Sequence, residues 1–319
     1  MAIKLYIQYD KQNRSGKGKF ISRLWPELEK LGVKVQWEQA GADIALGLTR
    51  WREKTRIPKV LRLDGIHLIG SKHHRWNNKR IKKSMQKADA VIYQSAWGKY
   101  MIENRFDIKP KSYVIHNGAD PEQYKKTMLV QPWPKNVIMS AKWVSRDDRR
   151  QKRLPDMVAI AWEYIKLHDD VCVYIAGKNN LPNYRHERMV NLGYLEEQGL
   201  QEWLSYCDVM LNLAWWDWCP NAVVEAICAK CIVVGSDKTG VGELIKLCGG
   251  VPLNLDAPIS PTAEFPDNRP PSFDYSKVIA GLDAAFRYSR KIEVNPEPLD
   301  IRNIAQKYKR VFEDVLNEL

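Results

Sequence analysis

Short hydrophobic runs alternate with segments of helical periodicity along the whole chain. Strands that are apolar nearly throughout and are separated by helices are typical of parallel sheets covered on both faces, so the pattern predicts an α/β fold. In the first half, the runs that predict strands are residues 2–8, 34–39, 42–48, 59–65, 88–95 and 112–118. The helical patterns in that half cover 18–31, 76–87 and 96–106.

The second half repeats this plan. Its predicted strands are 137–143, 171–177, 208–214 and 231–237. Its predicted helices are 154–168, 197–206, 220–230 and 241–247, followed by 275–290 and 300–319. A stretch with five prolines, 256–274, is expected to be a surface loop.

Two such halves in series predict two doubly wound, Rossmann-like domains. Periodicity is lost over 121–135, which holds three prolines, so the boundary is expected there. We therefore expect a first domain over 1–130 and a second over 131–299. Since ligands of open parallel sheets bind at the carboxyl ends of the strands, the two domains are expected to face a central cleft that holds the site.

The chain has 319 residues, of which 45% are hydrophobic, and this is enough for two domains with cores of their own. No stretch approaches the ~20 consecutive apolar residues that span a bilayer. The first ten residues lack the apolar core and cleavage site of a signal peptide. The expected location is therefore the cytoplasm.

The net charge of +12 is unevenly distributed. Residues 1–130 hold 27 Lys and Arg against 12 Asp and Glu, a balance of +15, whereas the remainder holds 23 against 26, a balance of −3. The basic half predicts contact with an anionic partner, such as phosphate groups, an anionic membrane surface or nucleic acid. A basic face that is merely solvated is the alternative interpretation.

The six cysteines all lie between Cys172 and Cys248. Cys228 and Cys231 have the spacing of a zinc or redox pair, but no second pair with suitable spacing accompanies them. Buried structural thiols are therefore favoured over a metal or redox role. The adjacent acids in residues 146–150 are flanked by arginines and are interpreted as a charged loop, so no metal site is expected.

The segment 216–226, WDWCPNAVVEA, follows a predicted strand and contains a predicted helix start at Pro220. The N-terminus of a helix is a natural seat for a phosphate. Asp217 can accept hydrogen bonds from hydroxyl groups before that seat, and Glu225 can do so beyond it. A diphosphate between two polyhydroxy groups fits this layout, and a nucleotide sugar has that structure. A helix start with an incidental acid remains the alternative.

These residues carry a family resemblance. Asp217 and Glu225, with the CPNAVVEA core between and around them, resemble the Glu-x7-Glu signature of retaining glycosyltransferases of family 4, which have the GT-B fold. Residues 239–244 resemble that family's Gly-Gly-x-x-Glu loop, a diphosphate contact. Residues 141–143 and 152–154 resemble its basic pair, here split by an insertion.

The first half follows the same family in order and spacing. The matching stretches are RLDG at 62–65, ADAVIYQS at 88–95 and VIHNGAD at 114–120. The resemblance covers roughly residues 1–255. The final helix, 300–319, resembles the one that returns to the N-terminal domain.

The resemblance implies roles for individual residues. Glu225 is expected to bind the ribose of the donor nucleotide, and Asp217 the hydroxyls of the donor sugar. Lys152 is expected to stabilise charge on the departing diphosphate, which contributes directly to rate. The other residues expected to contact the donor or its diphosphate are Lys142, Arg149, Cys219, Asn221, Ala222, Gly240, Val241, Gly16 and Gly18.

The chain departs from the family at three places. Its first signature acid is Asp217 rather than Glu. Lys230 and Ile232 stand where the family usually has Gly and Pro. Asp64 stands where the family often has a catalytic-cleft His, and His67 follows three residues later, so either is a candidate for that role.

The resemblance implies a transferase that moves a sugar, with retention, from a UDP- or GDP-sugar to a hydroxyl of a glycan, glycolipid or other glycoconjugate. No metal or other cofactor is expected. Transfer onto modified DNA and non-catalytic binding of a nucleotide sugar are the alternatives.

The basic run from His73 and His74 through Lys87 also leaves three interpretations open. It is expected to face the acceptor or an anionic membrane, which the protein would then contact peripherally. A solvated helix and a nucleic-acid surface, the least favoured of the three, are the others.

Overall fold

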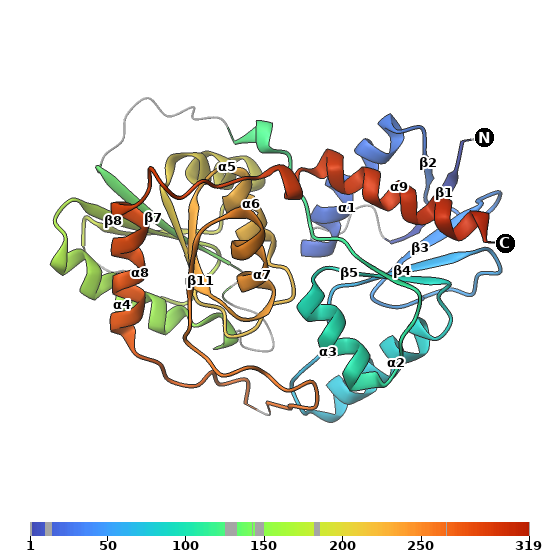
Figure 1. The fold of residues 1–319 in the computed structure, drawn as a ribbon, viewed down its shortest axis with the longest axis horizontal. Helices are drawn as coiled ribbons and strands as arrows, with labels where there is room; N and C mark the ends of the chain where they lie inside the picture. Colours follow the sequence, from blue (N-terminus) through green and yellow to red (C-terminus); the bar gives the residue numbers. More distant parts are fainter. Residues whose placement is uncertain are drawn as a thin grey trace. The chain divides into compact units, whose positions relative to one another are not determined.

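The computed structural model describes residues 2–9, 15–124, 133–141, 143, 150–181, 186–265 and 267–318. The chain divides into two compact units. The first unit contains Met1–Ala119, Ile259–Asp267 and Leu299–Leu319. The second unit contains Asp120–Pro258 and Asn268–Pro298. Each unit is built around one parallel sheet (Figure 1).

The sheet of the first unit has six strands in the order β2-β1-β3-β4-β5-β6, all parallel. The strands are β1 (Lys4–Gln8), β2 (Lys34–Gln36), β3 (Ile44–Leu48), β4 (Lys59–Leu63), β5 (Ala90–Tyr93) and β6 (Ser112–Val114). The central strands are buried almost throughout, because helices cover both faces of the sheet.

In the described part of this unit, the sheet is covered by the helices α1 (Gly16–Lys30), α2 (Lys72–Met85), α3 (Ala96–Phe106) and α9 (Ile301–Asn317). Helices α1 and α9 lie side by side on one face, and α2 and α3 lie on the other (Figure 1). Tyr308 and Phe312 of α9 are fully buried in the same core as Phe20 of α1. The ring centroids of Phe20 and Tyr308 are 5.9 Å apart. The final helix is thus part of the first unit's core.

The sheet of the second unit is also parallel and six-stranded, in the order β12-β11-β10-β7-β8-β9. The strands are β7 (Lys135–Ser140), β8 (Val171–Ala176), β9 (Met189–Gly193), β10 (Val209–Asn212), β11 (Ile232–Ser236) and β12 (Val251–Leu253). Its helices are α4 (Leu154–Leu167), α5 (Glu197–Tyr206), α6 (Asn221–Cys228), α7 (Thr239–Cys248) and α8 (Tyr275–Arg287). Helices α4 and α8 pack on one face, and α6 and α7 on the other (Figure 1).

Three short 3-10 turns complete the described elements, and they are η1 (Pro121–Gln123), η2 (Arg150–Lys152) and η3 (Glu297–Leu299). The predicted fold class, two doubly wound α/β sheets, is confirmed. The pattern did not predict the edge strands β9 and β12. Helix α2 begins one turn before its predicted start because the Ser71 hydroxyl caps it, accepting from the His74 N–H at 3.3 Å.

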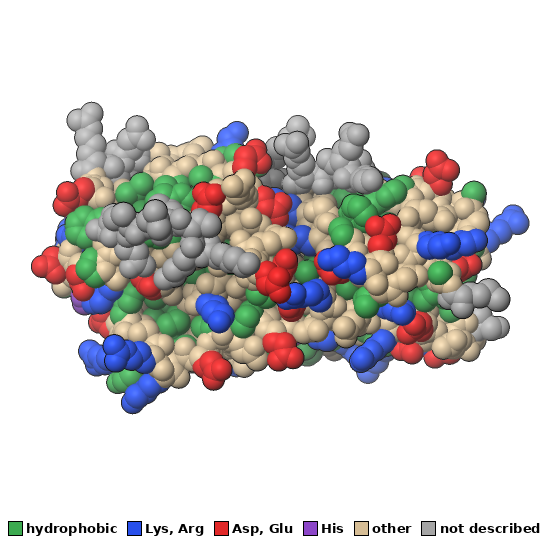
Figure 2. All heavy atoms as spheres, turned by 90° about the horizontal axis from the view of Figure 1, so that it is seen from above, with side chains coloured by type: hydrophobic (Ala, Val, Ile, Leu, Met, Phe, Trp, Pro, Cys, Tyr) green, Lys and Arg blue, Asp and Glu red, His purple; other side chains and the backbone are tan. Residues whose placement is uncertain are grey.

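The described residues of the proline-rich stretch 256–274 form no regular helix or strand, as predicted. Its expected place on the surface is only partly correct, because Asp256, Ile259 and Asn268 are buried. Over the face shown in Figure 2, acidic and basic side chains are interspersed. Among the described residues, no helix combines the length and the hydropathy needed to cross a bilayer.

Candidate active site

The segment with the two acids begins in the turn between β10 and α6 of the second unit and continues into α6. Trp215, Trp216 and Trp218 in this turn are all buried. Pro220 is the N-cap of α6, and its carbonyl accepts from the Val223 N–H at 3.0 Å. The helix therefore begins at Asn221, one residue later than predicted.

Asp217 lies in this turn and forms an ion pair with Lys152, the last residue of η2. Both side chains are mostly buried, with exposed fractions of 14% for Lys152 and 16% for Asp217. The two are 65 positions apart in the sequence. The structure thus brings together Asp217 and Lys152, for which the family resemblance implies contacts to the donor sugar and to the diphosphate.

The N-terminus of α7 lies against the same turn. The Gly240 N–H donates to the Asp217 carbonyl at 2.9 Å. A Cβ at Gly240 would overlap the backbone carbonyls of Asp217 and Trp218, so only glycine permits this approach. The predicted donor residues Gly240 and Val241 are therefore placed at the N-terminus of α7, directly beside Asp217.

The remaining predicted donor residues of this unit lie on or next to α6. Glu225 is buried in the second turn of α6, and Cys219 is buried just before the helix. Asn221 and Ala222 form its first turn and are half-buried. The predicted residues Lys142 and Arg149 lie outside the described residues.

A buried ion pair that the sequence did not predict fixes the Lys152 turn. Arg153 is fully buried and binds Asp256 with two bonds, Nη1–Oδ2 at 2.8 Å and Nη2–Oδ1 at 2.6 Å. Its guanidinium also donates to the Pro271 carbonyl at 2.9 Å. On the other side of Lys152, the Gln151 carbonyl accepts a hydrogen bond from the Trp215 N–H at 2.8 Å. Lys152 is thus held between two anchored neighbours.

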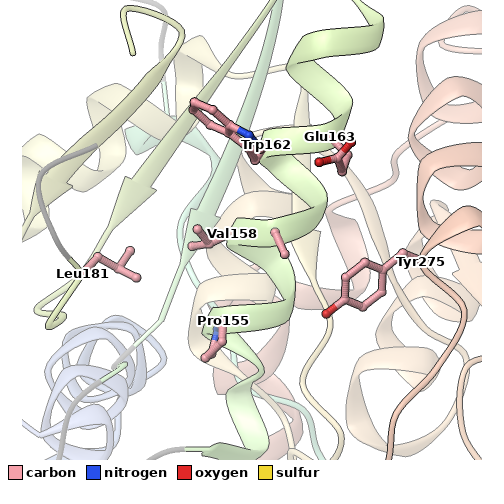
Figure 3. Close-up of a pocket in the computed structure, with 7 residues that line it drawn as sticks. Pro155, Val158, Trp162, Glu163, Leu181 and Tyr275 are labelled. Atoms are coloured by element: carbon pink, nitrogen blue, oxygen red, sulfur yellow. The ribbon is translucent and has the colours of Figure 1, made fainter. Parts of the chain in front are cut away.

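A pocket of about 530 Å³ lies beside α4 (Figure 3). It is lined by Pro155, Val158, Ala159, Trp162, Glu163, Leu181 and Tyr275. None of these is a predicted donor residue, and the lining is mainly apolar. The pocket is therefore not the site built by Asp217 and Lys152.

Asp64, one of the predicted residues of the first unit, lies in a polar cluster within that unit. Thr49, Asp64 and Gln94 directly follow β3, β4 and β5, so three neighbouring parallel strands end in one cluster. The Asp64 carboxylate accepts from Thr49 at 2.6 Å and from Gln94 at 2.8 Å. It also pairs with Lys17 at 2.9 Å and with the buried guanidinium of Arg62.

Burial alone would raise the pKa of Asp64, but the charges of Arg62 and Lys17 and the hydrogen bond from Thr49 lower it to about 2. The carboxylate is therefore ionised and held by four donors. This arrangement favours a role in shaping the site over a role in proton transfer. The signal in the sequence was the SGKGKF stretch, whose Lys17 reaches Asp64 from the first turn of α1.

His67 does not share the surroundings of Asp64. Its backbone exchanges hydrogen bonds with the Asn78 amide of α2, at 2.9 and 2.7 Å, and its ring stacks on His74 at 4.6 Å. Gly16 and Gly18 both lie in the first turn of α1, where Gly16 is exposed and Gly18 is buried.

All six cysteines are buried free thiols, as predicted. Within the described ranges, no group of three or more His, Cys, Asp or Glu side chains is arranged to hold a metal ion.

Comparisons with known proteins agree with this architecture. Residues 141–253 match a family model described as glycosyl transferases group 1. No curated protein matches the sequence. Among solved structures, sucrose-phosphate synthase of Thermosynechococcus elongatus has a TM-score of 0.70 at 10% identity, with 100% of both chains covered.

Two further structures are similar over nearly the whole chain. HepE of Anabaena, in complex with UDP and glucose, has a TM-score of 0.63 at 13% identity and covers 98% of this chain and 100% of its own. AviGT4, a glycosyltransferase involved in avilamycin A biosynthesis, has a TM-score of 0.60 at 13% identity with 99% of both chains covered. The chain therefore has the GT-B fold of glycosyltransferases, and its residues 141–253 carry the group 1 match.

Proposed function

We propose that this protein is a retaining glycosyltransferase that moves a sugar from a nucleoside diphosphate sugar to an acceptor hydroxyl. The observation that carries the proposal is the ion pair between Lys152 and Asp217. Asp217 lies in the turn before α6, and its carbonyl contacts the first turn of α7. Two helix N-termini and a cation form a seat for a diphosphate, and a carboxylate beside it can hold sugar hydroxyls.

In this proposal the ion pair between Lys152 and Asp217 opens when the donor binds, and Lys152 then pairs with the donor's diphosphate. Negative charge on the diphosphate grows as the bond from the sugar's anomeric carbon to its oxygen breaks, so a fixed cation stabilises the transition state more than the ground state. Asp217 is then available to the hydroxyls of the donor sugar, and Glu225 binds the ribose.

Retention follows if the acceptor attacks from the face that the diphosphate leaves. The acceptor oxygen forms the new bond to the anomeric carbon, and its proton passes to the departing diphosphate oxygen. This route needs no nucleophile from the protein. Asp64 and His67, in the first unit, are the proposed residues on the acceptor side.

UDP is the nucleotide to test first. HepE was solved with UDP-glucose, and the pneumococcal O-GlcNAc transferase GtfA, 14% identical, with UDP and GlcNAc. For the acceptor, a hydroxyl of a glycan or glycoconjugate is proposed from the family resemblance. Modified DNA is the second candidate, which the charge of the first unit favours.

The test is a thermal-shift and hydrolysis panel of UDP-, GDP- and ADP-sugars on the purified protein. We expect one nucleotide class to raise the melting temperature and to be hydrolysed slowly without acceptor. Glu225→Ala should abolish both effects, whereas Glu163→Ala, on the exposed side of α4, should change neither. Stabilisation without any turnover would instead support a non-catalytic nucleotide-sugar-binding protein.

A further inference from the structure

Helix α2 and the loop after β3 concentrate positive charge on the first unit. None of residues 65–88 is acidic, and seven of them are Lys or Arg. Arg75 of this helix is neutralised by Glu264 at 2.7 Å. Arg50, Arg52 and Arg80, by contrast, form no ion pair with any described residue.

Trp51 fixes two of these arginines beside α2. Its backbone N–H and its indole N–H both donate to Ser84 of α2, to the hydroxyl and the carbonyl, each at 3.1 Å. Arg50 and Arg52 flank this anchor. The Arg52 N–H is held further by the Gln8 side chain at 2.8 Å.

Like charges therefore gather at a fixed place. Burial lowers the pKa of Arg50, and the charges of Arg80 and Arg52 lower it further. Glu53, the acid in this loop, accepts from the Tyr6 hydroxyl at 3.1 Å. A bound anion would remove the mutual repulsion of the three guanidinium groups.

Trp76 adds an aromatic face to this cluster. Its side chain is 53% exposed, and the Arg80 guanidinium lies 4.5 Å from its ring centroid. Arg50, Arg52, Trp76 and Arg80 are named here the arginine–tryptophan surface. Single-stranded nucleic acids bind to surfaces of this kind, because guanidinium groups pair with the phosphates and an exposed aromatic ring stacks on a base.

A lipid membrane is a less suitable partner for the arginine–tryptophan surface than a nucleic acid. A helix that lies in a membrane interface exposes an apolar face. Of the three apolar residues of α2, Ile81 and Met85 are buried in the unit, with exposed fractions of 2% and 1%, and only Trp76 is exposed. Among the described residues of the first unit, the large exposed hydrophobic side chains are Trp76 and Tyr100.

We propose that the arginine–tryptophan surface binds the phosphodiester backbone and bases of a nucleic acid. Binding itself is independent of the proposed transfer. That a hydroxyl of this nucleic acid is the sugar acceptor rests on the proposed function.

The test is fluorescence anisotropy of a labelled single-stranded 20-mer oligodeoxynucleotide against the full chain between 50 and 300 mM KCl. Arg50→Ala/Arg80→Ala should weaken binding about tenfold or more and reduce the slope of log K against log salt by roughly 1.4, at ~0.7 for each of two phosphate contacts. Trp76→Ala should weaken binding about tenfold through lost stacking. Arg50→Lys/Arg80→Lys should retain the slope.

Tyr288→Ala/Lys291→Ala is the matched control, because it removes an exposed aromatic–cation pair, 5.8 Å apart, from the second unit. It should bind like the unchanged protein. The inference is overturned if the oligonucleotide does not bind at 50 mM salt, or if this control loses as much affinity as the arginine variant. It is also overturned if phosphatidylglycerol vesicles bind through Arg50 and Arg80 while oligonucleotides do not.

Donor binding is measured separately, as the thermal shift with UDP. Arg50→Ala/Arg80→Ala should leave that shift unchanged. If UDP raises the melting temperature but the protein does not bind nucleic acid, this inference is overturned and the proposed function is unaffected. Nucleic-acid binding without a thermal shift for any UDP-, GDP- or ADP-sugar of the panel would overturn the proposed function alone.

Discussion

Arg153 and Asp256 form a fully buried bidentate ion pair that joins segments 103 positions apart. The pair connects the turn that carries Lys152 to the proline-rich stretch before α8. Arg153 also has a left-handed backbone, with a φ of 56°. A conformation that glycine adopts freely is therefore maintained here by contacts of the side chain.

Asp256→Ala should lower the free energy of unfolding by about 3–5 kcal/mol, because it leaves the Arg153 guanidinium buried without its counter-charge. Urea titration followed by circular dichroism measures this. Glu163→Ala breaks an ion pair with Lys166 that is more than half exposed, and it should cost below about 0.5 kcal/mol. Equal losses of unfolding free energy in Asp256→Ala and Glu163→Ala would show that the buried pair does not stabilise the fold more than an exposed one.

Lys152→Ala should lower kcat for donor hydrolysis or transfer by about 100-fold with a smaller effect on KM, because its charge acts on the departing diphosphate. Steady-state kinetics with the nucleotide sugar identified in the panel provide the measurement. Lys166→Ala, an exposed lysine of α4, is the control and should be neutral. An unchanged kcat in Lys152→Ala would remove Lys152 from the site.

The Asp64 cluster should make stability depend on pH in acid. The pKa of Asp64 is lowered in the folded protein from 3.8 to about 2, so its contribution is fully present above about pH 4 and is lost as the pH falls through 2. The shift corresponds to about 2 kcal/mol. Between pH 5 and pH 2, the unchanged protein should therefore lose about 2 kcal/mol more than Asp64→Asn. Parallel pH curves from urea titrations would show that Asp64 is not held as described.

Lys230 ends α6 in a left-handed conformation, with a φ of 63°. Its N–H donates to the Ile227 carbonyl and the Cys231 N–H to the Ala226 carbonyl, both at 2.9 Å, which is a Schellman cap. Because glycine has no Cβ penalty there, Lys230→Gly should raise the free energy of unfolding by about 1 kcal/mol. Lys230→Ala, which removes only the charge and the side chain, should not stabilise, and thermal melting distinguishes the two. A destabilised glycine variant would mean that the lysine side chain contributes to the cap.

Much of the architecture followed from local pattern. Buried parallel strands such as β8 and β11 are continuous apolar runs, so the sequence alone predicts them. The strands β9 and β12 were missed for the opposite reason. Both lie at a sheet edge, β9 is half exposed, and β12 has only three residues, one of them proline.

The candidate site divides in the same way. Asp217, Glu225 and Gly240 lie in one continuous region whose spacing carries the family signal. The contacts that anchor Lys152 beside Asp217 come from distant parts of the sequence. Arg153 finds Asp256, and Asn268 donates to Gln151, across more than 100 positions of chain. No periodicity links such pairs, because their segments come together only in the folded unit.

The place of α9 has a consequence for synthesis on the ribosome. The core of the first unit draws on residues from Leu5 to Val315, whereas the second unit is built from residues between Asp120 and Pro298. Domains usually complete in the order of synthesis. Here the second unit can fold while the first unit still lacks helix α9. The nascent first unit therefore carries an open apolar face until α9 emerges, which makes it the part of the chain most dependent on protection from aggregation during translation.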